Sequence, residues 1–486
     1  MTTHTQLSQR PTPPSAARAQ GRSALVMGGG LAGIAAAVRL AQGGYRVTLL
    51  ETRKRLGGRA TSHVDPATGE PIDNCQHVLM GCCTNLIDLY ERLGVADHIA
   101  WHDALHFCDR AGRDSVLRAS AAPAPLHLLA ASWRFKGLTL REKMSIGRAL
   151  AHAIATPPLR RRAWFALLFT DWLRDRRQSP AVIERFWETV TISALNAPAA
   201  SVSTAYALQV VLQGFLAHRD AYRVGVPRVP LVSLYDAVRT IVQRAGGEVR
   251  SGVAVRAFVA DDATNAIAAI ELADGSTASA DAYVTALPPD RLATVAAASP
   301  GLRDARFGML DRFPCNTTIG IHLLYDRPIL STPHLAFIGS PVQWLFDAGD
   351  APVGQQRLRA VASAADDWAA MPADEIVRHT RAEIAAYLPQ SNTANLIEAR
   401  AIKERRATFT PSPGIDAIRP AASGDVANLY FAGDYCQTGW PATMEGAVRS
   451  GYRAAAAITG KPCLVPDLGG SARFHVPAYS PEPQPA

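Results

Sequence analysis

One stretch, from Ser23 to Glu51, constrains the fold of this chain more than any other part of the sequence. It reads SALVMGGGLAGIAAAVRLAQGGYRVTLLE and begins with the apolar run Ala24–Met27, which predicts a buried parallel strand. A glycine-rich turn follows, then a predicted helix through Leu40, and then the apolar run Val47–Leu50, which predicts a second strand. This order of strand, turn, helix and strand predicts an α/β unit that binds a nucleotide.

The glycines of the turn have the spacing GxGxxG, and each has its own role. Gly28 permits the tight turn, Gly30 lets a phosphate approach the backbone, and Gly33 lets the helix pack closely on the strand. The free backbone amides and the positive end of the helix then face a pyrophosphate. The turn residues that we expect at the cofactor are Gly28, Gly30, Leu31, Ala32 and Gly33.

Glu51 ends the second predicted strand, where its carboxylate can accept hydrogen bonds from an adenosine ribose. An acid at this place also argues against a 2′-phosphate in the pocket. The stretch does not separate FAD from NAD. A glycine-rich turn in an ordinary α/β unit is the alternative interpretation.

Length and composition indicate a globular protein with two domains. The chain has 486 residues, more than one core usually supports, and its 48% hydrophobic and 19% charged residues exclude a disordered chain. The net charge of +8 suits an anionic cofactor or a membrane surface, and we expect no nucleic-acid partner. The seven cysteines are scattered without a CxxC pair, which predicts no metal site and no disulfide framework, and favours a reducing cytosol.

A second glycine motif, Gly57-Gly58-Arg59, follows Glu51 after five residues. Two glycines let the backbone pass near a cofactor, and Arg59 can pair with a pyrophosphate. This acid followed by GG-R resembles flavin-dependent amine oxidases and phytoene-desaturase-type enzymes. The resemblance implies FAD rather than NAD. A basic surface loop is the alternative for Arg59.

Residues 73–83, DNCQHVLMGCC, are too polar for a plain strand. Within the flavin family this segment is similar to the stretch that passes close to the isoalloxazine ring, and with the TNL that follows it most resembles hydroxysqualene dehydroxylases. Family members typically carry glycine where this chain has Cys75, and an aromatic residue near Cys83. Gln76 and His77 are candidates for holding or protonating a substrate hydroxyl. A structural histidine bonded to backbone is the alternative for His77.

A matching motif lies toward the C-terminus, where the predicted strand Asn428–Ala432 leads into Gly433-Asp434 and a helix to Ile458. The resemblance implies that Asp434 binds the phosphate–ribityl part of FAD and that amides at the helix start face the flavin ring. Tyr435, where the family usually carries Trp, would sit over the ring and is a third catalytic candidate. A buried aspartate that caps a helix is the alternative for Asp434. The resemblance also places at the cofactor Gly433, Ala442, Thr443, Met444 and the backbone of Val253.

The cofactor motifs lie near both ends of the chain, with a long insertion between them. The predicted fold is therefore α/β, a Rossmann-type FAD-binding domain with an inserted α+β substrate domain. We expect the first domain to take residues 23–100, 228–290 and 415–465, and the second to take 101–227 and 291–414. Residues 1–22 and 466–486 are predicted to be loose tails.

Part of the insertion, Leu126–Trp172, is rich in Leu, Ala, Trp and Arg and predicts long helices. Within it, Leu159–Leu173 starts with an arginine cluster and carries apolar residues at helical spacing, namely Trp164, Leu167, Leu168 and Trp172. This pattern suits a helix that lies on an anionic membrane surface, and an internal helix is the alternative. Since no run of 18 apolar residues occurs, we expect a cytoplasmic protein that is peripheral at the inner face of the cytoplasmic membrane.

The resemblance to hydroxysqualene dehydroxylases implies a reaction in which reduced FAD replaces the allylic hydroxyl of hydroxysqualene by hydride and gives squalene. A carotenoid or squalene desaturase of the phytoene type runs the same hydride chemistry as an oxidation, so it is the nearest alternative. An amine oxidase is less favoured because the flavin-facing motifs hold no lysine. A non-enzymatic isoprenoid carrier is an alternative of another class. The sequence leaves the electron donor and the oligomeric state open.

Overall fold

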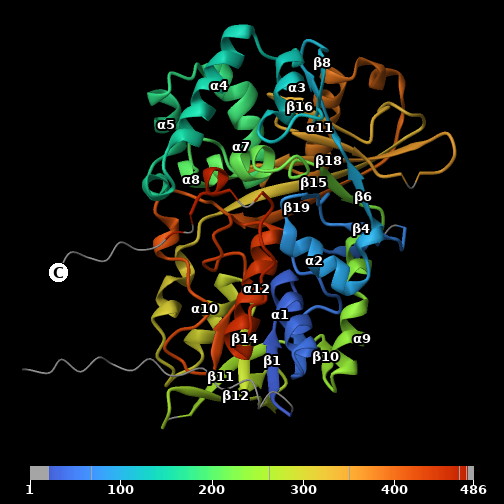
Figure 1. Cartoon of the computed structure of the whole chain (residues 1–486). Coiled ribbons are helices and arrows are strands. Elements are labelled where there is room, and N and C mark those ends of the chain that lie inside the picture. The colour runs from blue at the N-terminus through green and yellow to red at the C-terminus, as the bar shows by residue number, and fades with distance from the viewer. Residues whose placement is uncertain are drawn as a thin grey trace, which may run out of the picture.

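The structure is a computed structural model that describes residues 21–479 except 67, 262, 350, 470 and 478. All but the last two residues of the predicted N-terminal tail, 1–22, lie outside the described residues, as does the C-terminal tail from residue 480 onward. In Figure 1 a parallel sheet lies in the lower part with α1 and α12, and a larger sheet lies above it with the inserted helices. Both sheets combine segments that are far apart in the sequence.

The parallel sheet has five strands in the order β10-β2-β1-β14-β20. Its central strand β1 pairs with β2 on one side and β14 on the other, so that Ala24 lies between Val47 and Ala282. The final strand of the order comes from the C-terminal motif and pairs in parallel with β14. The strands span Glu248–Ser251 (β10), Arg46–Glu51 (β2), Ser23–Met27 (β1), Ala282–Thr285 (β14) and Leu429–Phe431 (β20).

Alternate side chains of β1 pack against two different layers. Ala24 and Val26 join the core formed with the helices, whereas Leu25 and Met27 join a core that includes a small antiparallel sheet. The helices are α1 (Leu31–Gln42), α2 (Thr84–Leu93), α9 (Ala237–Arg244) and α12 (Met444–Thr459). The small sheet consists of β11 (Val255–Asp261), β12 (Ala266–Leu272) and β13 (Thr277–Ala278), and α10 (Pro289–Ala297) lies beside it.

The larger sheet has seven strands in the order β19-β15-β18-β17-β16-β7-β8. One face packs on α11 (Ala373–Tyr387) through side chains such as Ile321 and Leu345. The opposite face presses on the segment that begins at Asp73, because a Cβ on Gly320 would lie 2.7 Å from the Asn74 carbonyl oxygen. The strands span Leu396–Phe409 (β19), Cys315–Tyr325 (β15), Gln356–Ser363 (β18), Trp344–Asp347 (β17), His334–Ile338 (β16), Ala104–Asp109 (β7) and Asp114–Arg118 (β8).

Two short sheets connect these layers. They consist of β3 (Ser62–Val64) with β4 (Pro71–Asp73), and of β5 (Leu79–Met80) with β9 (Val224–Pro227) and β6 (Ile99–His102). The segment of residues 73–81 therefore runs from one short sheet to the other, between the parallel sheet and the large sheet.

The inserted helices are shorter than the sequence predicted, since proline and loop residues interrupt Leu126–Trp172 several times. The first interruption is the loop of residues 135–139, and the second is the proline pair 157–158. The helices are α3 (Leu129–Arg134), α4 (Leu140–Ala155), α5 (Phe169–Asp175), α6 (Pro180–Val182), α7 (Glu188–Leu195) and α8 (Thr204–Val211). Two π-helical turns, Ile183–Trp187 and Leu212–Leu216, extend α6 and α8.

The hypothesis that Leu159–Leu173 is an interfacial helix is wrong. Residues Pro158–Phe165 form 3₁₀ turns, and Arg161 and Trp164 are buried. The Arg161 guanidinium donates to four backbone carbonyls, including those of Thr156 (2.9 Å) and His475 (2.7 Å), so it ties this turn to the C-terminal segment. The aromatic residues of the segment pack inside the same core, which explains why it is apolar on most sides.

Candidate functional site

The turn between β1 and α1 has the geometry that its glycines predict. Gly28 has a φ of +103°, and a Cβ there would lie 2.7 Å from the Ala286 carbonyl oxygen. A Cβ on Gly33 would overlap the Gly28 carbonyl oxygen, so the helix touches the strand at that point. Gly30 is different, because a Cβ there would meet only the Gly58 Cα, at 3.8 Å. The backbone at Gly30 is therefore open to a ligand.

Glu51 holds this turn from the end of β2. Its Oε2 accepts from the Gly29 amide at 2.7 Å, and its Oε1 accepts from the Arg53 amide at 2.8 Å. Val253 lies beside it, with its amide donating to the Glu51 carbonyl oxygen at 3.0 Å. Because a carboxylate has about four lone-pair sites, Glu51 keeps acceptor capacity for a ribose hydroxyl beside Val253.

The second glycine motif lies directly on the first. The Gly57 amide donates to the Gly29 carbonyl oxygen at 2.8 Å, and a Cβ on Gly58 would lie 2.9 Å from the Gly30 Cα. Both Gly57 and Gly58 have positive φ, at +106° and +61°, which glycine adopts without steric cost. The two motifs thus form one glycine-lined surface.

An ion pair joins the N-terminal motifs to the C-terminal one. The Arg59 Nη2 lies 2.6 Å from the Asp434 Oδ1, across 375 positions of sequence. Burial opposes the charge on Arg59, but the Asp434 carboxylate outweighs it and raises the pKa of Arg59. The Gly433 amide donates to the Ser450 Oγ of α12 at 2.7 Å, which fixes the turn that presents Asp434.

The segment after β4 carries a polar network that the sequence did not reveal in full. Arg359 of β18 donates to the Asp73 Oδ2 at 3.3 Å and to the Gln76 Oε1 at 3.2 Å. The His77 Nδ1 lies 3.0 Å from the Cys75 carbonyl oxygen. A carbonyl oxygen only accepts, so Nδ1 carries the proton and Nε2 of the neutral ring is an acceptor. Burial lowers the pKa of His77, which keeps the ring neutral.

Tyr435 is fully buried and packs edge-to-face on Phe313, with ring centroids 5.7 Å apart. Within the described part of the chain its hydroxyl has no hydrogen-bond partner. Burial raises the pKa of Tyr435 well above its ordinary value, so the phenol stays protonated. Buried Arg419, which the sequence did not single out, donates to the carbonyl oxygens of Asp434 (3.0 Å) and Cys436 (2.5 Å) and holds this turn.

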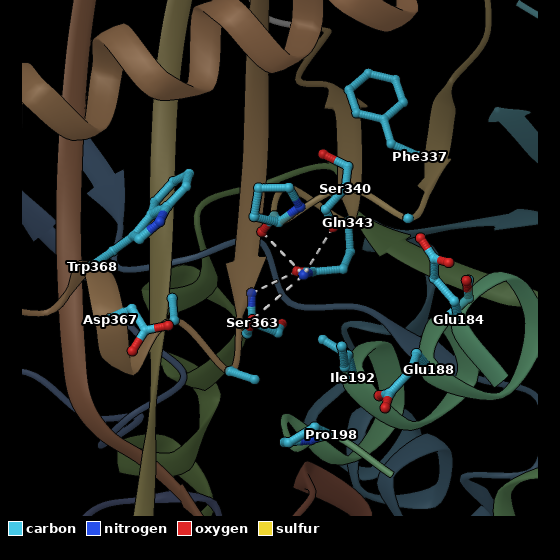
Figure 2. Close-up of a pocket in the computed structure, with 15 residues that line it drawn as sticks. Glu184, Glu188, Ile192, Pro198, Phe337, Ser340, Gln343, Ser363, Asp367 and Trp368 are labelled. Carbon is cyan, nitrogen blue, oxygen red and sulfur yellow. Dashed lines mark hydrogen bonds between the residues drawn. The ribbon is translucent and has the colours of Figure 1, made fainter. Parts of the chain in front are cut away.

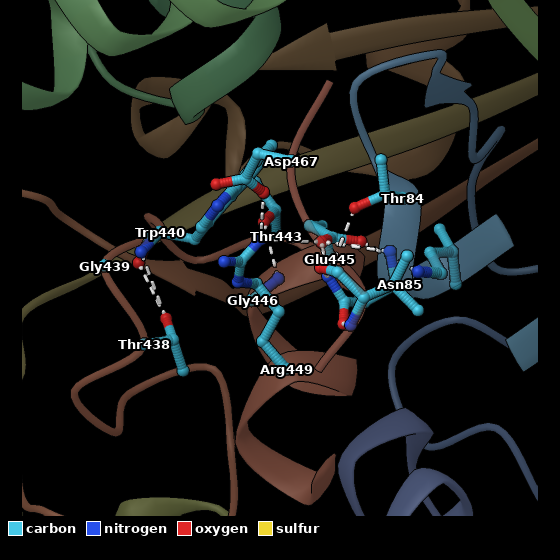
Figure 3. A network of polar contacts seen from close by, with 12 residues as sticks. Thr84, Asn85, Thr438, Gly439, Trp440, Thr443, Glu445, Gly446, Arg449 and Asp467 are labelled. Atoms are coloured by element: carbon cyan, nitrogen blue, oxygen red, sulfur yellow. Dashed lines mark hydrogen bonds and ion pairs between the residues drawn. The ribbon is translucent and has the colours of Figure 1, made fainter. Parts of the chain in front are cut away.

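The start of α12 is fixed by the network of polar contacts in Figure 3. Thr443 caps the helix, because its Oγ1 accepts from the Gly446 amide at 3.0 Å, and Ala442 before it is buried. The sequence did not predict the part played by Glu445, whose Oε2 accepts from the Leu86 amide of α2 at 2.8 Å. Arg449 pairs with Glu445 at 3.2 Å and with Asp467 at 2.5 Å. The amides at Thr443 and Met444 are therefore presented by a rigid helix end.

An apolar wall lies opposite the polar segment. Trp344 and Phe346 of β17 are stacked, with centroids 5.7 Å apart and an interplanar angle of 20°. Phe346 packs in one buried cluster with Cys75 and Val361, and Trp344 lies against that cluster. The Trp344 indole N–H donates to the Ser193 Oγ of α7 at 2.9 Å, which ties the wall to the inserted helices. Trp344 and Phe346 were not among the predicted site residues.

A cavity of about 360 Å³ lies elsewhere in the insertion, between the α7 region and the ends of β16 and β18 (Figure 2). Glu184 and Glu188 lie on the helical side of it, and Asp367 and Trp368 lie on the sheet side. Gln343 joins the two loops between them by accepting from the Ser363 amide at 2.7 Å. None of the predicted site residues lines this cavity, so it is separate from the surface where the motifs meet.

Known proteins match this chain over most of its length. The model of a family described as flavin containing amine oxidoreductase matches residues 31–459. A 15-cis-phytoene desaturase of Synechococcus elongatus is 28% identical over 460 residues, which are 89% of this chain and 95% of the relative. A hydroxysqualene dehydroxylase of Rhodopseudomonas palustris is 28% identical over 438 residues, which are 88% of this chain and 96% of the relative.

Solved structures share the fold. An oxidoreductase from Methanosarcina mazei superposes with a TM-score of 0.67 at 14% identity, and the match covers 90% of this chain and 100% of that one. At this identity the likeness shows the fold alone. It confirms the predicted α/β fold with a Rossmann-type nucleotide unit.

Proposed function

Because the chain belongs to the family of flavin-containing amine oxidoreductases, it is an FAD-dependent oxidoreductase, and we propose that it acts on an apolar isoprenoid. The family match confirms the predicted cofactor and the predicted class of enzyme. The proposal for the substrate is carried by one observation. The segment 73–77 touches both surfaces, because the Asn74 side-chain amide donates to the Arg59 carbonyl oxygen and Cys75 packs with Phe346 of the large sheet.

The residues present fit FAD. The open backbone at Gly30 suits the pyrophosphate, Arg59 and Asp434 suit the phosphate–ribityl part, and the capped start of α12 suits the ring. Glu51 and the backbone of Val253 lie together at the end of β2, where an adenosine would bind. Bound FAD supplies a hydride donor when reduced, or a hydride acceptor when oxidised, at its N5 atom.

We favour the reductive direction, in which the allylic hydroxyl of hydroxysqualene is replaced by hydride to give squalene. The C–O bond breaks, the oxygen leaves as water after gaining a proton, and the carbon gains the hydride. Tyr435 holds an unpartnered hydroxyl and suits the role of hydrogen-bond donor to the leaving oxygen. Because the His77 Nδ1–H is held by the Cys75 carbonyl, its Nε2 suits an acceptor that orients the substrate hydroxyl. Gln76 lies beside His77.

The wall of Trp344 and Phe346 suits the charge that develops on the substrate. An aromatic face attracts a cation, and a site without water strengthens that attraction. Val361 and Cys75 complete an apolar surface around Phe346. We propose that this wall holds the isoprenoid chain beside the reacting carbon.

Desaturation is the second candidate, and a specific finding favours it. The phytoene desaturase from Synechococcus elongatus is as similar to this chain, at 28% identity, as the hydroxysqualene dehydroxylase from Rhodopseudomonas palustris. The same residues would serve both reactions, because each reaction moves a hydride between the substrate and the flavin, in opposite directions. An amine oxidase and a non-enzymatic isoprenoid carrier are less favoured, since the flavin-facing motifs hold no lysine and Gly433-Asp434 is intact.

The substrate also determines where the protein works. A chain of about thirty apolar carbons gains on the order of 20 kcal/mol by leaving water, so it resides in a bilayer. None of the described helices is long and apolar enough to cross a bilayer. We therefore propose a peripheral enzyme that draws its substrate from the inner face of the cytoplasmic membrane.

Two anaerobic incubations test the proposal. Dithionite-reduced protein with hydroxysqualene should give squalene, with one flavin reoxidised for each squalene formed. Oxidised protein should leave phytoene and squalene unchanged. The opposite pattern would assign the enzyme as a desaturase, and no turnover of any isoprenoid would refute the proposed substrate class.

A further inference from the structure

Exposed apolar side chains gather on two neighbouring helices of the insertion. The described residues include twelve large exposed hydrophobic residues, and five of these lie within α3, the turn before it and the start of α4. Their exposed fractions run from 52% to 59%. We call them the α3–α4 patch, and they are Leu126, Leu129, Trp133, Leu140 and Met144.

The two helices present one surface. The Lys143 Nζ of α4 donates to the Trp133 carbonyl oxygen at the end of α3, at 2.5 Å. Leu129 and Trp133 are four residues apart on α3, and Leu140 and Met144 are four residues apart on α4, so each pair lies on one face of its helix. Figure 1 shows α3 and α4 at the outer end of the molecule, opposite the parallel sheet.

The charged residues in the stretch that carries the patch are mostly basic. Between Ala119 and Ala155 the only acid is Glu142, which accepts from the Thr139 amide at 2.7 Å as part of a capping box. Contiguous exposed apolar side chains mark an interaction surface, and basic residues at their rim favour an anionic partner. The basic residues of this stretch are Arg134, Lys136, Arg141, Lys143 and Arg148.

An apolar cluster that begins beside the patch in sequence extends toward the site. Leu128, next to Leu129, is buried in one cluster with Leu105 and Tyr222. Partly exposed apolar residues extend this cluster to Val78 and Met80, which follow His77. Trp344 of the aromatic wall lies against the same cluster. Apolar side chains therefore extend from Leu128, the residue before Leu129 of the patch, to the segment that follows His77.

We propose that the α3–α4 patch docks the enzyme on an anionic phospholipid bilayer and places the apolar cluster over the lipid. This inference rests on the proposed function for its purpose, but the contact itself does not depend on which isoprenoid reacts. Trp133 and the aliphatic residues enter the region below the headgroups, and Arg134, Lys136 and Arg141 contact the phosphates. The surface differs from Leu159–Leu173, where Arg161, Trp164 and Trp172 are buried.

Vesicle sedimentation of the FAD-loaded protein tests the contact. We expect the protein to bind vesicles of phosphatidylcholine with phosphatidylglycerol, and to bind phosphatidylcholine alone at least about tenfold more weakly. The variant Leu129→Ser/Trp133→Ser/Met144→Ser should lose at least about tenfold in partitioning. The matched control Leu159→Ser/Val353→Ser removes two exposed apolar residues elsewhere and should bind like the parent.

A charge variant separates the two parts of the contact. Arg134→Gln/Lys136→Gln/Arg141→Gln should lose binding to anionic vesicles, and salt should weaken the parent but change this variant little. Flavin absorbance and the melting temperature, unchanged in each variant, would show that the fold is intact. Unchanged vesicle binding by the apolar variant would overturn the proposal. A dimer of the parent that the apolar variant abolishes would also overturn the proposal, because the patch would then be a protein interface.

Activity distinguishes this inference from the proposed function. On detergent-dispersed hydroxysqualene the apolar variant should turn over like the parent, whereas on substrate within vesicles it should be at least about tenfold slower. If vesicle binding follows the patch but no isoprenoid reacts, the proposed function fails and the docking surface stands.

Discussion

At the scale of single residues, the contact between Arg59 and Asp434 joins the N-terminal motifs to the C-terminal one. The two residues meet at 2.6 Å although they come from opposite ends of the chain. The residue types were predicted from local motifs, because the acid, the glycines and the arginine have fixed spacing in the sequence. Their mutual contact was not predictable, because it depends on how β20 pairs with β14.

Replacing Asp434 by alanine should give folded protein that copurifies with little FAD. The carboxylate holds Arg59 in place, and losing it leaves that guanidinium without its ionic partner at the cofactor surface. Flavin absorbance per polypeptide measures the effect, and Asp434→Asn should fall between the parent and Asp434→Ala. A fully yellow Asp434→Ala protein would mean that Asp434 is a structural cap.

His334 makes stability depend on pH. Burial and the neighbouring His102 and His106 lower the pKa of His334 to about 4 from 6.5. Between pH 4 and pH 6.5 the unfolded chain binds more protons than the folded one. The stability that the neutral His334 ring contributes is therefore complete above about pH 6.5 and is lost as the pH falls toward 4. Between pH 7 and pH 5 the loss is about 2 kcal/mol.

Urea unfolding at the two pH values measures this loss. His334→Phe should reduce the difference between pH 7 and pH 5, because the ring then has no proton to bind. The same exchange at exposed His98 should leave the difference as in the parent. An unaltered difference in the His334 variant would show that other groups cause the acid sensitivity.

At the scale of elements, the predicted strands and helices that carry the motifs agree with the structure. The predicted strands Ala24–Met27 and Val47–Leu50 lie within β1 and β2, because their apolar side chains are buried. Strand β19, Leu396–Phe409, was not predicted, since charged residues alternate along a strand that has one partner, β15. The strands of residues 99–118 were also missed, because their side chains are buried by partners far away in sequence.

Two of the three arginines at the start of Leu159–Leu173 should behave differently from each other. Arg161→Ala removes a buried guanidinium that satisfies four carbonyls, so we expect a loss of about 3 kcal/mol in the free energy of unfolding. Arg160→Ala removes an exposed side chain and should change stability by less than about 0.5 kcal/mol. Urea unfolding compares them. Equal stability of the two variants would contradict the buried position of Arg161.

At the scale of the whole molecule, the sequence predicted the five-stranded parallel sheet and its motifs better than the seven-stranded sheet. FAD motifs are local, so Gly30, Glu51 and Asp434 stand out in one dimension. The aromatic wall is not local, because Trp344 and Phe346 meet Cys75 only after the large sheet has formed. The α3–α4 patch was hidden for the same reason, since exposure depends on what the rest of the chain covers.

Deuterium can follow the hydride from the flavin to the substrate. Protein reduced with dithionite in D₂O carries deuterium at the flavin N5, so hydroxysqualene should yield squalene with one deuterium at the carbon that lost the hydroxyl. One flavin should be reoxidised for each deuterium incorporated, and protein without FAD should give none. Squalene without deuterium at that carbon, or flavin that stays reduced in the presence of hydroxysqualene, would contradict the account.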